Sequence, residues 1–96
     1  MSNIGVVAKI VAKAGKEELA LEELGKMVAP TLQEPGCLKY VLHRSMQNHG
    51  EFWFVEEWMS VEALDKHKLT PHYLNLGKQK ANFAESGEVI VLEPIR

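Results

Sequence analysis

The residues best suited to chemistry lie in the second half of the chain, where Trp58 precedes two histidines, His67 and His72. His67 comes three residues after Leu64 and four after Ala63, so helical spacing places it at the edge of a core-facing surface. His72 is expected in the first turn of a following helix, where the helix dipole favours a neutral imidazole. Spacing alone makes His67 and, less strongly, His72 candidate functional residues. The alternatives are a hydrogen-bonded structural histidine at His67 and an exposed one at His72.

The chain lacks the sequence motifs of phosphate-binding, metal-binding and cysteine-based sites. No GxGxxG or GxxxxGK[ST] loop is present to bind phosphates, and neither HExxH nor paired cysteines occur. His67 and His72 are five residues apart across an expected helix break, which is poor spacing for metal ligands. Cys37 follows a Pro-Gly turn and enters a strand, which favours a packed thiol over a reactive one. We therefore expect no metal and no cofactor.

Length and composition indicate a single globular domain over residues 1–96. Hydrophobic residues make up 46% and charged residues 25% of the chain, and the net charge is -2 without a basic stripe. Nucleic acid and anionic membrane surfaces are therefore not expected as partners. No apolar run reaches the ~18–20 residues of a membrane span, and the first residues do not resemble a signal peptide. The lone Cys37 has no internal disulfide partner, and together these features favour the cytoplasm.

Four strands are predicted to position these residues. β-branched residues and alternating apolar residues place them at Ile4–Val11, Cys37–Ser45, Glu51–Met59 and Glu88–Ile95. The Asn-His-Gly segment at residues 48–50 supplies the turn chemistry of a hairpin between the second and third strands.

Helical spacing of apolar residues begins at Lys16, with a kink or break expected near Ala29 because the following proline disrupts a helix. Ser60 is predicted to cap a helix that runs to about Lys68. Thr70 is predicted to cap a helix that runs to about Glu85, is ended by Gly87 and is followed by the last strand. The resulting order, β-α-β-β-α-β, is the ferredoxin-like α+β motif, which builds a four-stranded antiparallel sheet with its helices on one face.

The strand Glu51–Met59 is apolar on both of its faces. Alternation places Phe52, Phe54 and Trp58 on one face and Trp53, Val55 and Met59 on the other. Helices on one side of the sheet would leave the other apolar face exposed, over a larger area than monomers usually tolerate. We therefore expect a homodimer that pairs the open sheet faces, with coverage by loops or the carboxyl-terminal tail as the alternative. A one-residue shift in register would exchange the two faces, so their assignment stays open.

A gap between the two short helices, beside aromatic strands, is expected to form an apolar pocket with a few polar groups at its edge. Trp58 ends one of these strands, and Tyr73 and Leu76 follow His72 at helical spacing. The alternative for Trp58, Phe52 and Phe54 is that they are core residues.

Three segments together resemble the antibiotic biosynthesis monooxygenase family. They are Glu34-Pro-Gly-Cys-Leu-Lys-Tyr40, Glu56-Glu-Trp58 and His67-Lys-Leu-Thr-Pro-His72-Tyr73. The resemblance extends across nearly the whole chain, including the opening strand. It implies a ferredoxin-like protomer, a dimer whose sheets face each other as an α+β barrel, and a pocket between sheet and helices in each subunit. The family's best-known activity is oxygenation of electron-rich phenols and quinols without metal or flavin.

The resemblance implies a cofactor-independent monooxygenase in which His67 assists proton transfer from a quinol. The residues that it suggests for substrate binding are Trp58, Phe54, Phe52, Tyr40, His72, Tyr73 and Leu76. Polyketide-oxidising members carry an Asn where this chain has Phe54, which favours a smaller quinol as substrate. Haem-degrading relatives need an Asn in the first strand and a His late in the second helical region. Residues 8–10 and 74–77 offer neither, so haem is not expected.

Two other functions stay open. The segment His67–Tyr73 also resembles the family branch that isomerises a phosphorylated autoinducer breakdown product. Such a pocket should present cations, for which Lys39, Arg44, Lys66 and Lys68 are available. The third function is a non-catalytic dimeric barrel that binds a small aromatic molecule. An isomerase needs no oxygen and a binding protein turns over no quinol, so product analysis without oxygen and ligand binding would distinguish the three.

Overall fold

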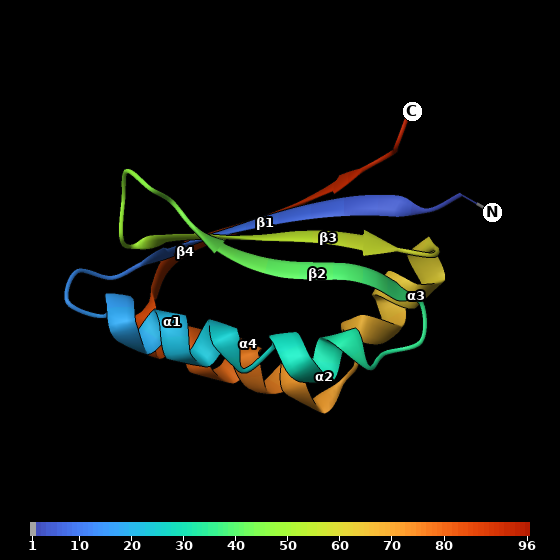
Figure 1. The fold of residues 1–96 in the computed structure, drawn as a ribbon. Helices are drawn as coiled ribbons and strands as arrows, with labels where there is room; N and C mark the ends of the chain where they lie inside the picture. The colour runs from blue at the N-terminus through green and yellow to red at the C-terminus, as the bar shows by residue number, and fades with distance from the viewer. Residues whose placement is uncertain (1) are drawn as a thin grey trace.

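The computed structural model describes residues 2–96, which form four strands and four helices (Figure 1). In chain order these are β1 (Ile4–Ala12), α1 (Glu17–Gly25), α2 (Val28–Leu32), β2 (Cys37–Arg44), β3 (Glu51–Trp58), α3 (Val61–His67), α4 (Pro71–Phe83) and β4 (Ala84–Leu92). The strands make one antiparallel sheet in the order β2-β3-β1-β4, and the helices cover one of its faces. The predicted ferredoxin-like fold is confirmed. No helix within residues 2–96 has the length and apolar character needed to cross a membrane.

Alternation along β1 and β3 assigns the two faces of the sheet. Val6 lies opposite Glu56 and Ala8 lies opposite Phe54, and the even-numbered residues of both strands are buried beneath the helices. Phe52 and Trp58 belong to the same set and are fully buried. The face of β3 that carries these aromatic rings therefore packs against the helices, which answers the question of register that the sequence leaves open.

Both predicted helix starts after β3 are confirmed. The Ser60 hydroxyl accepts a hydrogen bond from the backbone N–H of Ala63 at 3.1 Å at the start of α3. The Thr70 hydroxyl accepts one from the backbone N–H of Tyr73 at 3.3 Å at the start of α4. Each hydroxyl satisfies an N–H group that the first turn of a helix leaves without an intrahelical partner. These two caps fix where the helices beside the end of β3 begin.

The first helical region breaks earlier than the sequence predicts. α1 ends at Gly25 with Lys26 as its C-cap, and α2 begins at Val28, whereas the break was expected near Ala29. In a continuous helix the Lys26 carbonyl would accept a hydrogen bond from the N–H of residue 30. Pro30 has no N–H, and its ring would collide with that carbonyl. The break therefore lies about one turn before the proline, which is accommodated in the first turn of α2.

The end of α4 also differs from its prediction. The helix ends at Phe83 and β4 begins at Ala84, whereas a helix to about Glu85 and a strand from Glu88 were expected. Gly87 does not end the helix but lies inside β4, in register with β1. Pairing with β1 supplies backbone hydrogen-bond partners for this segment, and that tertiary interaction outweighs the local signal of the glycine.

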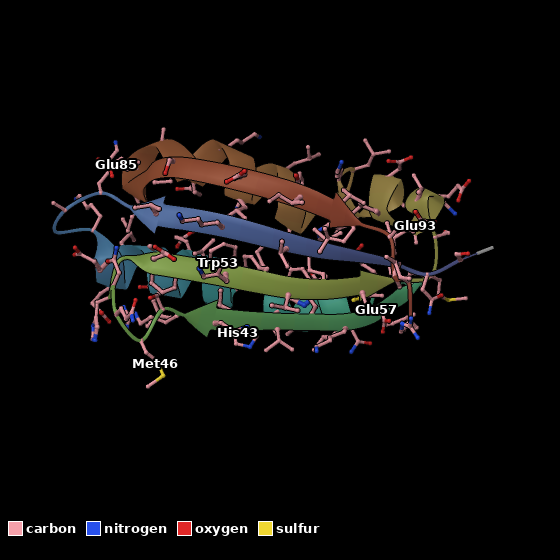
Figure 2. The ribbon with its side chains drawn as sticks, turned by 90° about the horizontal axis from the view of Figure 1, so that it is seen from above. His43, Met46, Trp53, Glu57, Glu85 and Glu93 are labelled. Carbon is pink, nitrogen blue, oxygen red and sulfur yellow. The ribbon has the colours of Figure 1, made fainter. Side chains whose placement is uncertain are left out.

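The sheet face turned away from the helices is open (Figure 2), and apolar side chains are exposed on its two edge strands, β2 and β4. Val41 of β2 is 39% exposed, and Ile90 and Leu92 of β4 are 40% and 47% exposed. Trp53 of β3 lies on the same face, with the Lys9 ammonium 5.7 Å from the centre of its ring. The predicted surplus apolar face is therefore present, and a second copy as its cover stays a prediction.

Candidate functional site

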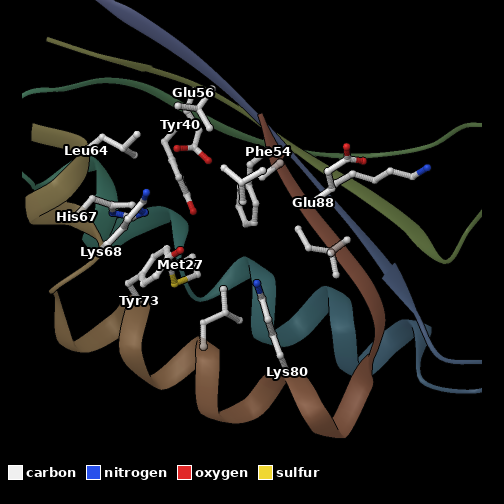
Figure 3. Close-up of a pocket in the computed structure, with 17 residues that line it drawn as sticks. Met27, Tyr40, Phe54, Glu56, Leu64, His67, Lys68, Tyr73, Lys80 and Glu88 are labelled. Atoms are coloured by element: carbon white, nitrogen blue, oxygen red, sulfur yellow. The ribbon is translucent and has the colours of Figure 1, made fainter. Parts of the chain in front are cut away.

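A pocket of about 130 Å³ lies between the sheet and helices α3 and α4 (Figure 3). Its apolar lining includes Val6, Ala8, Ile10, Phe54, Leu64 and Leu76. A cavity of this size holds about one aromatic ring. The pocket that the sequence predicts beside the short helices is therefore formed.

Polar side chains enter the pocket from both layers of the fold. Tyr40 and Glu56 come from the sheet and His67 comes from α3, and all three are buried. Lys68 and Lys80 also line the pocket and bring ammonium groups to it, and Lys68 is exposed to solvent. The pocket therefore combines an apolar body with a few ionisable groups, which is the usual character of a small-molecule site.

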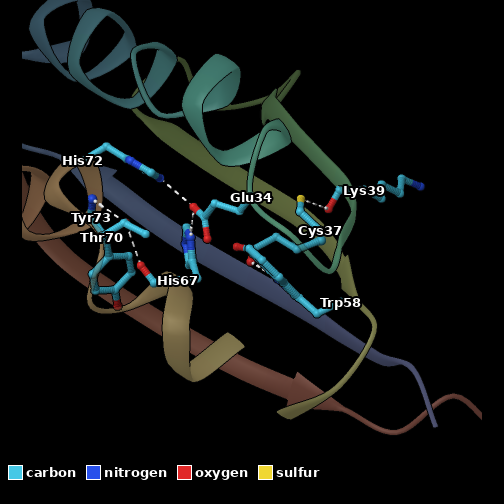
Figure 4. A network of polar contacts seen from close by, with 9 residues as sticks. Glu34, Cys37, Lys39, Trp58, His67, Thr70, His72 and Tyr73 are labelled. Carbon is cyan, nitrogen blue, oxygen red and sulfur yellow. Dashed lines mark hydrogen bonds and ion pairs between the residues drawn. The ribbon is translucent and has the colours of Figure 1, made fainter. Parts of the chain in front are cut away.

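His67 and His72 are joined through one carboxylate oxygen of Glu34, which precedes β2 (Figure 4). The distance from Glu34 Oε2 is 2.7 Å to His67 Nδ1 and 2.5 Å to His72 Nε2. Side-chain exposure rises along this chain of contacts, from 3% at His67 to 10% at Glu34 and 20% at His72. The three side chains thus connect a buried imidazole to the protein surface.

The contact with Glu34 determines which nitrogen of His67 carries a proton. An ionised carboxylate can only accept hydrogen bonds, so Nδ1 must donate its N–H to Oε2. Burial lowers the pKa of His67 below its usual 6.5, although the hydrogen bond and the charge of Glu34 act in the opposite direction. The ring is therefore neutral at pH 7, and its other nitrogen, Nε2, carries a free lone pair.

Three aromatic rings surround His67. Its ring centre lies 4.7 Å from that of Trp58, 5.0 Å from that of Tyr73 and 5.7 Å from that of Tyr40. These contacts and the hydrogen bond to Glu34 leave the imidazole few alternative orientations. A proton-transfer group that is fixed in this way requires little reorganisation when a substrate binds.

Glu34, His67 and His72 also form a donor set that suits a transition metal, since two imidazoles and a carboxylate are common ligands. Two ligands of one zinc ion stand roughly 3.2–3.4 Å apart when Zn–N is about 2.0–2.1 Å. Here both imidazole nitrogens lie 2.7 Å or less from Glu34 Oε2. Those distances are hydrogen-bond distances, so we interpret the three residues as a hydrogen-bonded triad.

Glu56 is the other ionisable group buried in the pocket. The Trp58 indole Nε1–H donates a hydrogen bond to Glu56 Oε1 at 2.9 Å. Burial raises the pKa of Glu56 to about 6, and the hydrogen bond from Trp58 only partly opposes that effect. The carboxyl group therefore changes its charge close to physiological pH.

The sequence pattern of the antibiotic biosynthesis monooxygenase family matches residues 3–79. The chain belongs to this family. The protein Rv0793 of Mycobacterium tuberculosis, which bears the provisional name of a monooxygenase, is 35% identical over 81% of this chain and 76% of its own length. The solved structure of Rv0793 superposes with a TM-score of 0.93, at 32% identity over 99% of this chain and 97% of that one.

Two other solved structures support the same assignment. The PA3566 protein of Pseudomonas aeruginosa has a TM-score of 0.96 at 28% identity, over 100% of this chain and 97% of its own. A structure described as an antibiotic biosynthesis monooxygenase has a TM-score of 0.90 at 30% identity, over 97% of this chain and 99% of its own. A monooxygenase-like function is therefore supported at the level of the antibiotic biosynthesis monooxygenase family.

Within this family fold, five of the residues predicted for the site line the pocket. They are Tyr40, Phe54, His67, Tyr73 and Leu76. Helical spacing had indicated a core-facing edge for His67, whereas alternation along β3 had left open which face turns toward the helices.

Three other predicted residues do not line the pocket. Trp58 is fully buried behind it, where it contacts the His67 ring and holds Glu56. Phe52 is fully buried away from the pocket, with the Arg44 guanidinium carbon 4.9 Å from the centre of its ring. His72 contacts Glu34 instead, because the first turn of α4 points it toward the segment before β2.

Sequence reasoning missed two functional candidates, Glu34 and Glu56. Glu34 was interpreted only as part of a turn and of a family motif, and its contact with His67 joins residues 33 positions apart. Glu56 gave a local signal that could have been used, because it occupies a core-facing position between Phe54 and Trp58. A carboxylate at such a position costs folding free energy and is seldom retained without a partner or a role.

Proposed function

We propose that this protein is a monooxygenase that oxidises a small quinol with O2 and needs no metal or flavin. One observation carries the proposal. A buried, neutral His67 lines an apolar pocket, and because its Nδ1–H is bound to Glu34, Nε2 is the nitrogen left for a substrate hydroxyl. A base of this kind, in a site that excludes most water, is what a cofactor-independent oxygenation requires from the protein.

The reaction needs positioning and proton transfer more than any other assistance. Nε2 of His67 takes a hydroxyl proton from the quinol, and the resulting anion passes one electron to O2. The two radicals join in a C–O bond at a ring carbon, and His67 returns the proton to the peroxide. Loss of the proton on that carbon and cleavage of the O–O bond release water and leave a hydroxyquinone. One oxygen atom of O2 enters the product and the other becomes water.

Glu34 supports this step electrostatically. When His67 takes a proton, the Glu34 carboxylate at 2.7 Å stabilises the imidazolium that forms. His72 shares the same carboxylate oxygen and is more exposed, so it offers a route for protons between the pocket and solvent. Glu34 and His72 therefore act through His67 as positioning residues.

The proposal is tested by following oxygen uptake with hydroquinone in wild-type protein and in the variants His67→Ala and His67→Gln. Loss of a positioned base should lower the rate by roughly a hundredfold or more. His49→Gln is the matched control, because His49 is exposed in the β2–β3 turn. Unchanged turnover in both His67 variants would remove His67 from the mechanism. Binding without turnover of any quinol would favour the non-catalytic alternative.

An isomerase acting on a small phosphorylated metabolite is the second candidate, because Lys68 and Lys80 line the pocket. Of the four cations that the sequence suggested for such a substrate, only Lys68 lines the pocket. Arg44 instead forms an ion pair with Glu18 at 3.0 Å. The buried carboxylate of Glu56 would also repel a phosphate. Product formation from a phosphorylated hydroxyketone under argon would favour this second function.

We further propose that the protein is a homodimer joined through its open sheet faces, in the manner of an α+β barrel. The support is the set of exposed apolar side chains Val41, Ile90 and Leu92 on the two edge strands of that face. Covering them would remove apolar surface from water, which is the main driving force for association.

A further inference from the structure

Glu56 is a buried carboxylate with no cation in contact. The residue is 7% exposed and occupies a helix-facing position of β3. None of the ion pairs among residues 2–96 includes it. Its one hydrogen bond within those residues is the one from Trp58 Nε1 to Oε1. Such a group lowers stability unless something else binds it.

The second oxygen of Glu56, Oε2, is the part left for a ligand. It accepts no hydrogen bond from residues 2–96. It is also not completely buried, so a ligand in the pocket can reach it. Glu56 lines the pocket, and its carboxylate is directed toward the space beside Tyr40 and Phe54 (Figure 3). The pocket therefore contains one free, charged hydrogen-bond acceptor on its sheet side, while His67 lies on its helix side.

We propose that Glu56 Oε2 accepts a hydrogen bond from a second substrate hydroxyl, so that the pocket selects single-ring aromatic diols over aromatic monoalcohols. The inference rests on the proposed function, since it takes a quinol as substrate and His67 as the acceptor of the first hydroxyl. A pocket of about 130 Å³ admits about one ring, and a ring with two hydroxyls can meet an acceptor on each side. Glu56 is thus a specificity-determining residue of the site.

The groups around Glu56 determine how this selectivity depends on pH. Tyr40 of β2 and Tyr73 of α4 stay protonated, because burial and the charge of Glu56 raise the pKa of both. Lys68, beyond α3, lowers the pKa of Glu56, and Glu34 raises it, with burial as the main cause of a value of about 6. Neutral His67 adds no charge to the pocket at pH 7. Selectivity for diols should therefore be complete above about pH 7 and weaken as the pH falls through 6.

The variant Glu56→Gln replaces a hydrogen-bond acceptor in the pocket by a hydrogen-bond donor, with little change in the shape of the side chain. The Trp58 indole can only donate, so the amide oxygen should take the place of Oε1 and leave the NH2 group in the pocket. The acceptor is thereby replaced by a donor. Glu85→Gln, on β4, is the matched control because Glu85 is exposed and does not line the pocket.

The test measures binding of hydroquinone and of 4-fluorophenol by calorimetry under argon. Fluorine is close to hydroxyl in size but cannot donate, so the ratio of the two dissociation constants reports the second hydroxyl. At pH 7.5 this ratio should change by about tenfold or more between wild-type protein and Glu56→Gln, as expected for a hydrogen bond to a charged group. Glu85→Gln should keep the wild-type ratio. Wild-type protein at pH 5 should approach the ratio of Glu56→Gln, which provides a test that needs no variant.

An unchanged ratio in Glu56→Gln and at pH 5 would overturn the inference, and so would failure of wild-type protein to bind hydroquinone at millimolar concentration. Because no oxygen is present, the result is independent of turnover. Selectivity that depends on Glu56 without oxygen uptake would contradict the proposed function alone. Oxygen uptake with an unchanged ratio would contradict the role of Glu56 alone.

Discussion

His67 is a usable base because two opposing effects act on its ring. Burial among aromatic side chains lowers the pKa, whereas the hydrogen bond and charge of Glu34 raise it, and burial is the larger effect. The imidazole is therefore neutral at pH 7, and it has a stabilising partner ready when it gains a proton. Activity should be constant at neutral pH and fall on acidification below pH 6.5, as His67 becomes charged and Glu56 becomes neutral.

Glu34→Gln tests the role of Glu34 as a positioning residue. The neutral amide lacks the negative charge that stabilises the imidazolium of His67, so kcat/KM for a quinol should fall by about tenfold or more. Because Glu34 raises the pKa of His67, the variant should also move the acidic limb of the kcat profile to lower pH. Glu62→Gln, in an exposed turn of α3, should change neither quantity. A loss of rate without a shift of the limb would reduce Glu34 to a structural role.

Glu56→Gln should stabilise the protein at neutral pH. The folded state raises the pKa of Glu56 from 4.5 to about 6, so ionising this group costs folding free energy as the pH rises through that range. Removing the charge should increase the free energy of unfolding by about 1–2 kcal/mol at pH 8 and by almost nothing at pH 4.5. Urea titrations at both pH values and at one protein concentration measure this difference, with Glu85→Gln as the control. Equal effects at the two pH values would mean that desolvation of the charge is not the cause.

At the scale of residues, sequence reasoning succeeded where a regular element fixed the direction of a side chain. Helical spacing directed His67 and Tyr73 toward the pocket that they line, and strand alternation grouped Phe54 with Phe52 and Trp58 but could not say which face they take. It failed for Glu34, because a segment without regular structure gives no direction, and because the contact with His67 depends on the packing of α3 beside the start of β2. Trp58 was assigned to the wall of the pocket, but spacing could not show that the indole lies one layer deeper.

The turn before β2 is the element that holds Glu34 in place. Gly36 has a φ of +88°, and its carbonyl accepts a hydrogen bond from the Met59 N–H at 2.8 Å. A Cβ atom added to Gly36 would lie 2.7 Å from the Cβ of Ala63 in α3. The turn is therefore packed between the end of β3 and α3, the helix that carries His67. This packing fixes the position of Glu34 relative to His67.

Gly36→Ala should be costly for both stability and activity. The left-handed backbone costs about 1–2 kcal/mol for any residue with a Cβ, and the collision with Ala63 should add about 1–3 kcal/mol. Gly15→Ala is the matched control, since Gly15 has a φ of +83° but nothing within 4 Å of an added Cβ. Urea unfolding should separate the two variants by about 1–3 kcal/mol. Equal destabilisation by Gly36→Ala and Gly15→Ala would show that the turn does not pack against α3.

Secondary structure was predictable wherever local chemistry determined it. The capping hydroxyls of Ser60 and Thr70 marked two helix starts correctly, because each forms its hydrogen bond within one turn of chain. The break after Gly25 was placed too late, because the carbonyl disturbed by a proline lies four residues before it. β4 begins earlier than predicted because its pairing with β1 is a long-range interaction, which no local signal reports.

For the whole molecule, the open face of the sheet determines the assembly that we propose. Ile90→Glu would place a charge among the exposed apolar side chains of that face, opposite Val7 of β1, and should dissociate the dimer. Sedimentation should then give the protomer mass of 10.8 kDa, with wild-type protein at twice that value. Met46→Glu, at a fully exposed position in the β2–β3 turn, should leave the dimer intact. A wild-type monomer would contradict the proposed assembly.

We propose that the pocket beside His67 inserts one oxygen atom of O2 into a quinol without metal or flavin. The most direct test is to turn over hydroquinone under 18O2 with chelator-treated protein and to measure the mass of the hydroxyquinone product by mass spectrometry. We expect one 18O atom per product molecule, one O2 consumed for each quinol, and a rate at least a hundredfold lower in His67→Gln. Product that contains no 18O, or that forms equally well without O2, would contradict the claim.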